Sequence, residues 1–200
     1  MGRLSGKNIV ITGAAGGQGE VASRRFCDEG ATVLGTDIDE AAGRKLEERL
    51  RADGLAFSFL AADVATGTGV TAIAEGARST LGSRVDVLYN NHGIILGKPL
   101  LETTEEEWDR IHDVDLKSVF LLTKAIVPLM PEGSSIINVS SAGGLVALPS
   151  MTAYGAAKGG PGDVLPRCGR RPRLSRYPGQ RDLPRRDRHA DAAQLRQHPR

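Results

Sequence analysis

The chain has 200 residues, of which 40% are hydrophobic, and this length suits one domain with a substantial core. No apolar run approaches the roughly 20 residues of a membrane span, and the N-terminus lacks the apolar stretch of an export signal. We therefore expect a cytoplasmic protein without a membrane partner. Cys27 and Cys168 lie far apart and without metal-ligand spacing, which favours reduced thiols over a metal centre.

The formal net charge of +2 combines two unlike parts. Residues 1–160 are net acidic, whereas residues 161–200 are rich in arginine and contain most of the ten prolines. That composition predicts a disordered or loosely packed tail. The tail is basic, but it lacks interleaved aromatics, a basic helix and any nucleic-acid-binding signature, so we expect no nucleic-acid partner. We divide the chain accordingly into a main region, 1–160, and a tail, 161–200.

The first elements predict a βαβ unit. Asn8–Thr12 is a short, β-branched apolar run, typical of a fully buried strand. A glycine-rich turn, residues 13–19, separates this strand from a helical segment that reaches about Glu29. A second strand, Gly30–Asp37, follows and ends on an acid. We expect a right-handed crossover between two parallel strands.

Strands and helices continue to alternate up to Lys158. In chain order we predict a helix at Ile38–Asp53, a strand at Leu55–Asp63, a helix at Gly69–Leu81, a strand at Val85–Tyr89, a helix from the capping box Thr104–Glu107 to about His112, a helix at Asp115–Leu129 and a strand at Ser135–Ser140. This alternation indicates an α/β fold with a doubly wound, Rossmann-like parallel sheet. The glycines and proline at 159–162 would break the next helix, so the sheet is predicted to be C-terminally incomplete, without a strand outside the fifth.

The glycine-rich turn is the first candidate binding site. It reads Gly13-Ala-Ala-Gly-Gly17-Gln18-Gly19. Glycines let the backbone approach a pyrophosphate closely, and the amino end of a helix offers free N–H groups, so the turn predicts dinucleotide binding. Asp37, at the end of the second strand, can accept hydrogen bonds from the adenosine ribose and would repel a 2′-phosphate. We therefore expect NAD as the cofactor in preference to NADP.

A second candidate site follows the fifth strand. Ser141 lies just past that strand, and Tyr154 and Lys158 are four residues apart. If Tyr154 opens a helix, both side chains share one face, where the ammonium favours the phenolate. Such a tyrosine can exchange a proton with a substrate oxygen, and Ser141 can donate a second hydrogen bond to that oxygen. Taken alone, the pair is more typical of a tyrosine packed on a lysine stem, and its functional weight comes from the motifs upstream.

These motifs resemble, in kind and order, those of the short-chain dehydrogenase/reductase family over residues 1–160. The matching segments are Thr12-Gly13-Ala-Ala-Gly-Gly17-Gln-Gly19 for its Thr-Gly-x-x-x-Gly-x-Gly motif, Asp63-Val64 for its adenine-contacting pair, Asn90-Asn91-His92-Gly93 for its Asn-Asn-Ala-Gly motif, and Ser141, Tyr154 and Lys158 for its catalytic residues. His92 replaces an alanine, and we expect it to be a loop residue with one backbone hydrogen bond rather than a substrate contact.

The resemblance implies an NAD-dependent alcohol dehydrogenase or carbonyl reductase that transfers a hydride between the nicotinamide and a secondary alcohol or ketone. It implies Tyr154 as the acid/base, Lys158 as the residue that holds the nicotinamide ribose, and Ser141 as the group that orients the substrate oxygen. Cofactor contacts are implied for Thr12, Gly13, Gly17, Gln18, Gly19, Asp37, Asp63, Val64, Asn90, Gly93, Tyr154 and Lys158.

One departure from the family concerns Asp115, which stands where the family usually has an asparagine. That asparagine helps to hold a water that relays protons to the lysine, so Asp115 joins the implied catalytic residues. As an anion near Lys158, an aspartate would compete for the ammonium, which predicts a slower or pH-shifted enzyme. The alternative interpretation is a solvated aspartate on a helix surface.

The second departure is that the resemblance ends at about Gly160, where the family continues the tyrosine–lysine helix and adds a sixth strand and a substrate lid. The abrupt change in composition is what an out-of-frame reading of a GC-rich gene would produce, and we hypothesise a frameshift, which translation of the DNA in the other frames tests. Two interpretations therefore stay open: an active oxidoreductase, or an inactive or cofactor-binding-only remnant. The family forms homo-oligomers through the helices at 115–129 and from Tyr154 onward, and the shortened second helix argues against such an assembly here.

Overall fold

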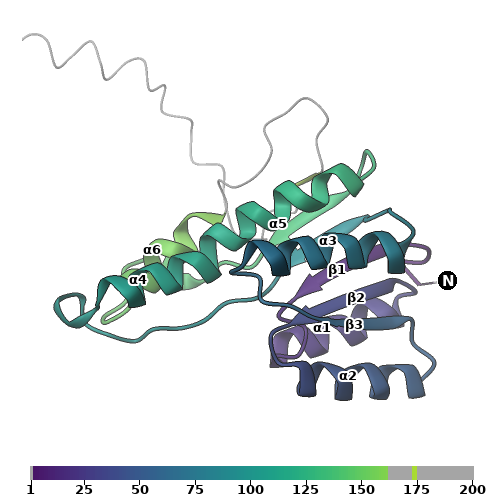
Figure 1. Cartoon of the computed structure of the whole chain (residues 1–200), viewed down its shortest axis with the longest axis horizontal. Helices are drawn as coiled ribbons and strands as arrows, with labels where there is room; N and C mark the ends of the chain where they lie inside the picture. Colours follow the sequence, from purple (N-terminus) through teal and green to yellow (C-terminus); the bar gives the residue numbers. More distant parts are fainter. Residues whose placement is uncertain (1, 162–172, 175–200) are drawn as a thin grey trace, which may run out of the picture.

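The computed structural model describes residues 2–161 and the pair 173–174, and its six parallel strands form one sheet in the order β3-β2-β1-β4-β5-β6 (Figure 1). This order is that of a doubly wound dinucleotide-binding fold, so the predicted fold class is confirmed. The strands are β1 (Asn8–Thr12), β2 (Thr32–Asp37), β3 (Phe57–Ala61), β4 (Val87–Asn90), β5 (Ser135–Asn138) and β6 (Arg173–Leu174). The α-helices are α1 (Gly17–Asp28), α2 (Glu40–Ala52), α3 (Gly67–Leu81), α4 (Glu105–His112), α5 (Ser118–Ile126) and α6 (Thr152–Gly159). Short helical turns lie at Leu100–Glu102, Asp113–Lys117, Val127–Leu129 and Ala142–Gly144.

Successive side chains of the buried strands point to opposite faces of the sheet, so the core is divided into two clusters, one on each face. In β1, Ile9 and Ile11 join the cluster that α1 and α2 cover, whereas Val10 joins the cluster that α3 and α5 cover. Figure 1 shows these two pairs of helices on opposite sides of the sheet. The chain leaves β1 toward one face and β4 toward the other, and such a switch leaves a crevice at the carboxyl edge of a parallel sheet.

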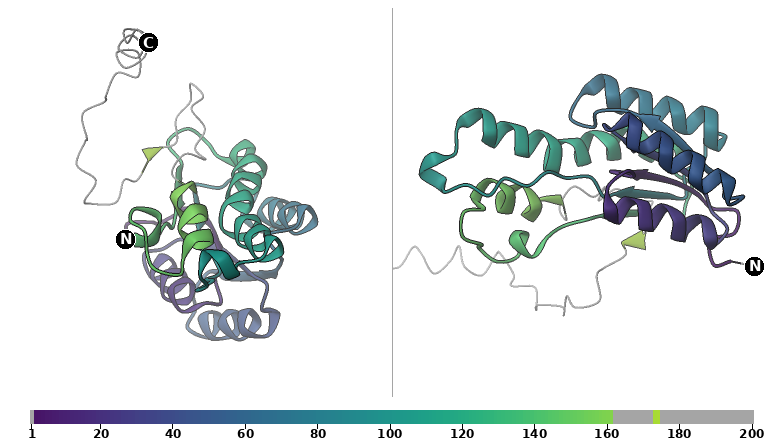
Figure 2. Two further views of the ribbon diagram at one scale, coloured as in Figure 1. Left: turned by 90° about the vertical axis from the view of Figure 1, so that its left-hand side faces the viewer. Right: turned by 90° about the horizontal axis from the view of Figure 1, so that it is seen from below.

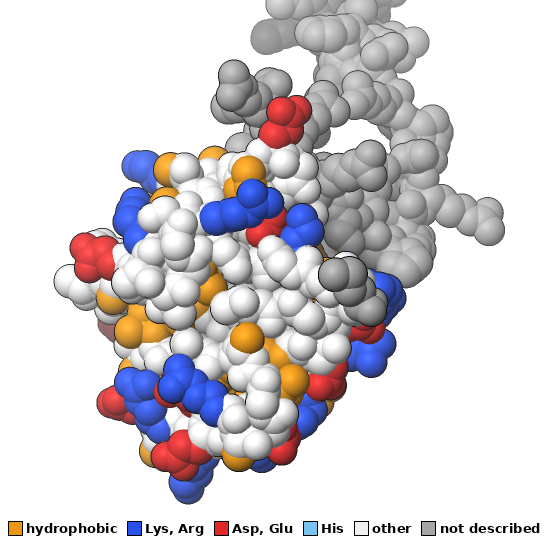
Figure 3. Space-filling model, turned by 90° about the vertical axis from the view of Figure 1, so that its right-hand side faces the viewer, with side chains coloured by type: hydrophobic (Ala, Val, Ile, Leu, Met, Phe, Trp, Pro, Cys, Tyr) orange, Lys and Arg blue, Asp and Glu red, His pale blue; other side chains and the backbone are white. Residues whose placement is uncertain are grey.

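The amino edge of the sheet is held by a buried carboxylate. Asp86, just before β4, accepts hydrogen bonds from Lys7 Nζ, Asn8 N and Arg84 Nη2. Burial alone would raise the pKa of Asp86, but these bonds hold it at about 2. The face seen in Figure 3 shows lysine and arginine interspersed with aspartate and glutamate, so the described part of that face carries charges of both signs.

α4 and α5 form one continuous rod rather than two helices. The capping box of Thr104 and Glu107 does start α4. The expected break after His112 is wrong, because neither glycine nor proline follows it, and the backbone instead widens into a π-helical turn at Asp113–Lys117 before α5 begins. Such turns are rare and are found frequently at functional sites. This one carries Asp115, which is fully buried.

α6 is short, as the sequence predicts, and ends at the pair Gly159-Gly160. It lies alongside the rod, as Figure 2 shows, and packs on α4 through Ile111, Ala153 and Ala157. This packing brings α6 against the π-helical turn and so sets Lys158 opposite Asp115.

The expectation that β5 has no outer neighbour is wrong, because Ser135 and Ile136 pair in parallel with Arg173 and Leu174. A parallel ladder is made by backbone groups, so a segment without a strand-like side-chain pattern can form one. The predicted disorder of the tail otherwise concerns residues outside the described part of the chain. Among the described residues, no helix has the length and apolarity to cross a membrane, and no cluster of three or more His, Cys, Asp or Glu could hold a metal ion.

Candidate active site

A cavity of about 500 Å³ opens at the carboxyl ends of β1, β2, β3 and β4. Of the predicted cofactor residues, those that line it are Gly13, Gly17, Gln18, Gly19, Asp37, Asp63, Val64 and Gly93. The predicted residues that do not line it are Thr12, Asn90, Tyr154 and Lys158. The lining residues for which no cofactor contact was predicted are Ala15, Gly16, Ile38, Asp39, Ala62, Asn91, His92, Ile94, Arg110 and Val114.

The predicted glycines of the turn have different surroundings. Gly13 has a φ of +65°, and a Cβ there would come within 2.8 Å of His92 Cα. A Cβ at Gly19 would lie 1.9 Å from Gly13 O, so glycine is required where α1 packs on the turn. A Cβ at Gly17 would meet no heavy atom of the part of the chain that the structure describes within 4 Å. The open space at Gly17 lies at the start of α1. The N-cap residue of this helix is Gly16, which has no side chain to cap the backbone N–H groups, and this arrangement suits a phosphate group.

Asp37 links the glycine turn to the end of β2. Its carboxylate accepts hydrogen bonds from Ala15 N at 3.0 Å and from Asp39 N at 3.1 Å.

The cation in the lining of the cavity is Arg110 of α4, whose Nη1 lies 4.0 Å from Asp63 Oδ2. No motif in the sequence points to Arg110, because α4 lies far along the chain from the glycine turn.

Thr12 and Asn90 lie beneath the cavity rather than in its wall. Thr12 is fully buried, and its Oγ1 accepts a hydrogen bond from Asn91 N at 3.2 Å. Asn90 is also buried and donates to Asn138 Oδ1 at 2.8 Å. Asn91, in contrast, lines the cavity and donates to the carbonyls of Thr12 and Gly13. Thr12 and Asn90 therefore shape the loop that carries Asn91.

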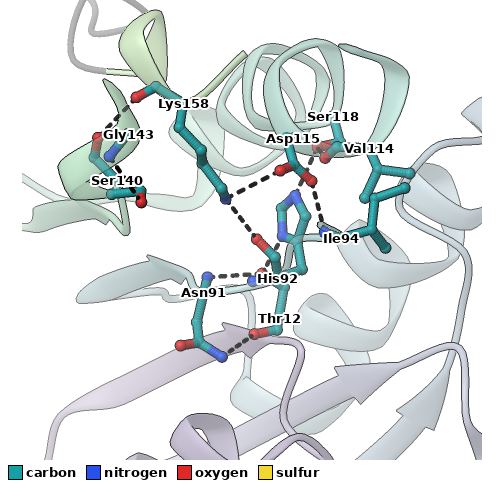
Figure 4. Close-up of polar contacts among 11 residues, drawn as sticks. Thr12, Asn91, His92, Ile94, Val114, Asp115, Ser118, Ser140, Gly143 and Lys158 are labelled. Carbon is teal, nitrogen blue, oxygen red and sulfur yellow. Dashed lines mark hydrogen bonds and ion pairs between the residues drawn. The ribbon is translucent and has the colours of Figure 1, made fainter. Parts of the chain in front are cut away.

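The expectation for His92, a loop residue with a single backbone hydrogen bond, is wrong. Its side chain is buried, and the ring lies between two hydroxyls, with Nδ1 2.5 Å from Thr12 Oγ1 and Nε2 2.6 Å from Ser118 Oγ (Figure 4). Burial, and to a lesser degree the charge of Lys158, lowers the pKa of His92 to about 4. Sequence reasoning missed Ser118, because it lies 26 residues along the chain from His92 and belongs to no recognised motif.

Lys158 and Asp115 form a buried ion pair. Lys158 Nζ lies 3.6 Å from Asp115 Oδ2 and donates to His92 O at 3.3 Å, as Figure 4 shows. Asp115 Oδ1 accepts from Ile94 N at 2.8 Å, whereas Oδ2 has no hydrogen-bond partner among the described residues. Burial raises the pKa of Asp115, and Lys158 opposes that shift. The alternative of a solvated surface aspartate is therefore wrong.

Tyr154 and Ser141 both lie next to the short turn Ala142–Gly144. Ser141 Oγ accepts from Gly143 N at 3.2 Å and so caps that turn. Tyr154 is half-buried, and a Cβ on Gly143 would come within 3.6 Å of its ring. Lys158 follows Tyr154 by one turn of α6. A Cβ on Gly93 would come within 2.7 Å of Lys158 Nζ, so Gly93 lies between the ammonium and the cavity.

The sequence model of the short chain dehydrogenase family matches residues 7–164. The chain is 39% identical over 166 residues to a cyclopentanol dehydrogenase of Comamonas sp., and the match covers 80% of this chain and 64% of that protein. It is 38% identical over 163 residues to a 3-oxoacyl-acyl-carrier-protein reductase (FabG) of Thermotoga maritima, with 79% of this chain and 65% of that protein covered.

The fold is similar to the crystal structure of a short-chain dehydrogenase/reductase from Burkholderia phymatum in complex with NAD, with a TM-score of 0.75 and 32% identity over 80% of this chain and 57% of that chain. The chain spans less than two thirds of the length of these three proteins. The family match nevertheless includes the glycine turn, the sheet from β1 to β5 and α6. The chain belongs to the short-chain dehydrogenase family.

Proposed function

We propose that this chain is the cofactor-binding and catalytic part of an oxidoreductase that transfers a hydride between NAD and a secondary alcohol or ketone. The observation that best supports the proposal is the placement of Tyr154 and Lys158 one turn apart on α6, with the Lys158 ammonium just behind Gly93 of the cavity wall. Because the chain spans only part of its relatives' length, the activity of the whole protein belongs to the proposal.

The cavity residues fit a nicotinamide dinucleotide. The open space at Gly17 and the free N–H groups of α1 suit its pyrophosphate, and the Asp37 carboxylate at the end of β2 suits a ribose hydroxyl. Asp63 and Val64 line the cavity past β3, where they can contact the adenine. When bound, the cofactor would supply the hydride acceptor for alcohol oxidation or the hydride donor for ketone reduction.

Tyr154 would move the proton of this reaction. Its phenolate takes the hydroxyl proton when the carbinol carbon is oxidised, and its phenol returns that proton when the ketone is reduced. Ser141 donates a hydrogen bond to the same oxygen, and the Lys158 ammonium lies one turn further along α6. Asp115 attracts the same ammonium from 3.6 Å, which predicts a reaction that is slower or has a shifted pH dependence.

The substrate proposed is an apolar secondary alcohol or the corresponding ketone. A second hollow, of about 240 Å³, shares Ile94 and Arg110 with the cavity and is otherwise lined by Ile95, Leu96, Glu106, Glu107 and Ile111. The loop after Ser141 exposes Leu145, Val146 and Leu148. Two relatives are named for cyclopentanol and for 3-oxoacyl groups, which are substrates with a carbinol or keto carbon next to apolar chain.

Asp37→Asn is expected to reduce the preference for NADH over NADPH about tenfold, because it removes the charge that repels a 2′-phosphate but keeps an oxygen to accept from Ala15 N. Dissociation constants for both reduced cofactors, measured by fluorescence, give the ratio. Asp53→Asn, at a surface ion pair with Arg24, is the control and should leave the ratio unchanged. An unchanged ratio in Asp37→Asn would contradict the role of this carboxylate.

Gly17→Ala is expected to weaken NADH binding about tenfold and to leave the free energy of unfolding within about 1 kcal/mol of the wild-type value. The added Cβ meets none of the described residues within 4 Å, but it fills the space proposed for the phosphate. Gly19→Ala is the contrasting variant. Its Cβ would collide with Gly13 O, so it should lose stability as well as binding. Chemical denaturation and fluorescence titration measure both quantities. Undiminished binding by Gly17→Ala would place the pyrophosphate elsewhere.

A cofactor-binding protein without turnover is the second candidate. It is favoured by the Lys158 ammonium, which contacts Asp115 and the His92 carbonyl and does not line the cavity. NADH binding and NAD-dependent oxidation of cyclic secondary alcohols separate the two candidates. Turnover supports the oxidoreductase, binding without turnover supports the second candidate, and absence of binding contradicts both.

A further inference from the structure

The segment His92–Ile94 holds both members of the buried ion pair. Lys158 Nζ donates to His92 O, and Ile94 N donates to Asp115 Oδ1. Gly93, between these two contacts, lies so close to the ammonium that a side chain would displace it. Together with the packing of α6 on the π-helical turn, this backbone segment therefore helps to fix where the ammonium and the carboxylate lie.

The ring of His92 attaches this segment to two distant elements. Nδ1 bonds the Thr12 hydroxyl at the end of β1, and Nε2 bonds the Ser118 hydroxyl at the first residue of α5, as Figure 4 shows. His92 as a whole residue is 8% exposed, so water cannot readily replace either bond. The ring thus joins the sheet to the rod that contains the π-helical turn.

The hydrogen bonds of the two hydroxyl groups show which nitrogen of the His92 ring carries the proton. Ser118 Oγ donates its hydrogen to Val114 O, so it must accept from His92, which places a hydrogen on Nε2. Thr12 Oγ1 accepts from Asn91 N and has one hydrogen to give, which goes to Nδ1. The ring is therefore neutral, and the bonds run in one direction from Thr12 through His92 to Ser118 and Val114.

We propose that His92 is a positioning residue: its two ring hydrogen bonds fix the segment His92–Ile94 and thereby place Lys158 and Asp115 for the work of Tyr154. The catalytic consequence rests on the proposed function, whereas the placement of the ion pair does not. An alanine, which is usual at this position of the family motif, makes neither bond. The charged groups that face the ring's segment are Lys158 of α6 and Asp115 of the π-helical turn.

The first test needs no turnover. The ring signals of His92 are identified in ¹⁵N-detected NMR of the full chain by their absence in His92→Gln. At neutral pH they should show an unprotonated Nδ1 and a protonated Nε2. The ¹⁵Nζ signal of Lys158 should shift in His92→Ala. It should stay near its wild-type position in His92→Gln, whose amide nitrogen can reach Ser118 as Nε2 does. A proton on Nδ1, or a Lys158 signal unmoved in His92→Ala, would overturn the proposal.

The second test uses turnover with NAD and cyclopentanol. His92→Ala should lower kcat about tenfold or more, because misplacement of catalytic groups by less than an ångström is costly, with a smaller effect on the KM for NAD. His92→Gln should recover most of that loss, whereas His92→Asn, which can reach only Thr12, should not. Equal kcat values for the alanine and glutamine variants would overturn the proposal. A wild-type chain without turnover would count against the proposed function, while the Lys158 signal would still decide the role of His92.

Discussion

Tyr154→Phe is expected to lower kcat for alcohol oxidation by about 10²- to 10⁴-fold, because it removes the phenol that we propose exchanges a proton with the substrate oxygen. The phenyl ring keeps its place beside Gly143, so the fold and the affinity for NADH should change little. Steady-state kinetics together with fluorescence titration of NADH measure both effects.

The matched control for this variant is Tyr89→Phe. Tyr89 lies on β4 with its ring packed edge-on against Phe26, away from α6, so its loss of a phenol oxygen should leave kcat near the wild-type value. A Tyr154→Phe enzyme that keeps more than about a tenth of the wild-type kcat would exclude Tyr154 as the acid/base.

Lys158→Met is expected to abolish measurable turnover and to lower the free energy of unfolding by about 3 kcal/mol at pH 8, because it leaves the Asp115 carboxylate buried without its cation. The loss should shrink as the pH falls. Burial raises the pKa of Asp115 in the folded chain, so the folded state binds its proton more tightly than the unfolded state does. The stability of the variant therefore falls as the pH rises from about 4, the pKa of an unfolded aspartate, through the raised pKa of Asp115 in the folded chain. Below both pKa values Asp115 is protonated in both states, and the loss of stability disappears.

Two further variants belong to this experiment: Asp115→Asn alone, and Lys158→Met combined with Asp115→Asn. Asparagine keeps an oxygen for Ile94 N but carries no charge, so Lys158→Met combined with Asp115→Asn should regain most of the lost stability and none of the turnover. Asp115→Asn alone should shift the pH dependence of kcat. Urea denaturation at pH 5 and pH 8, and kcat across the same range, are the measurements. A Lys158→Met chain equally stable at both pH values, or an unchanged pH profile in Asp115→Asn, would show that the two groups do not interact.

The fold and the cavity at the carboxyl edge of the sheet could be predicted because their determinants are local in the sequence. A β-branched apolar run, a glycine turn and an acid at the next strand end lie within forty residues, and their spacing alone brings Gly13, Gly19 and Asp37 to one edge of the sheet. The capping box at Thr104 likewise predicts the start of α4, since both partners lie within one turn. The short α6 could be predicted because two glycines follow Lys158.

The buried polar network could not be predicted, because it depends on backbone geometry between distant segments. Nothing in the sequence 112–118 marks a π-helical turn, and a plain α-helix would direct Asp115 and Ser118 differently. The pairing of His92 with Thr12 and Ser118 spans 80 and 26 residues of chain, so a pattern read over neighbouring residues cannot show it. The strand β6 was missed for a different reason, since its pairing uses backbone atoms that every residue has.

The π-helical turn also changes the direction in which the rod presents its apolar side chains. One surplus residue in a helix offsets everything downstream by about 100° around the axis, relative to an uninterrupted α-helix. Upstream of this offset, α4 packs on α6, and downstream of it α5 packs on α3. The offset thus lets a single helical rod present its apolar stripe in two directions, toward the small helix that carries Tyr154 at one end and toward the main core at the other.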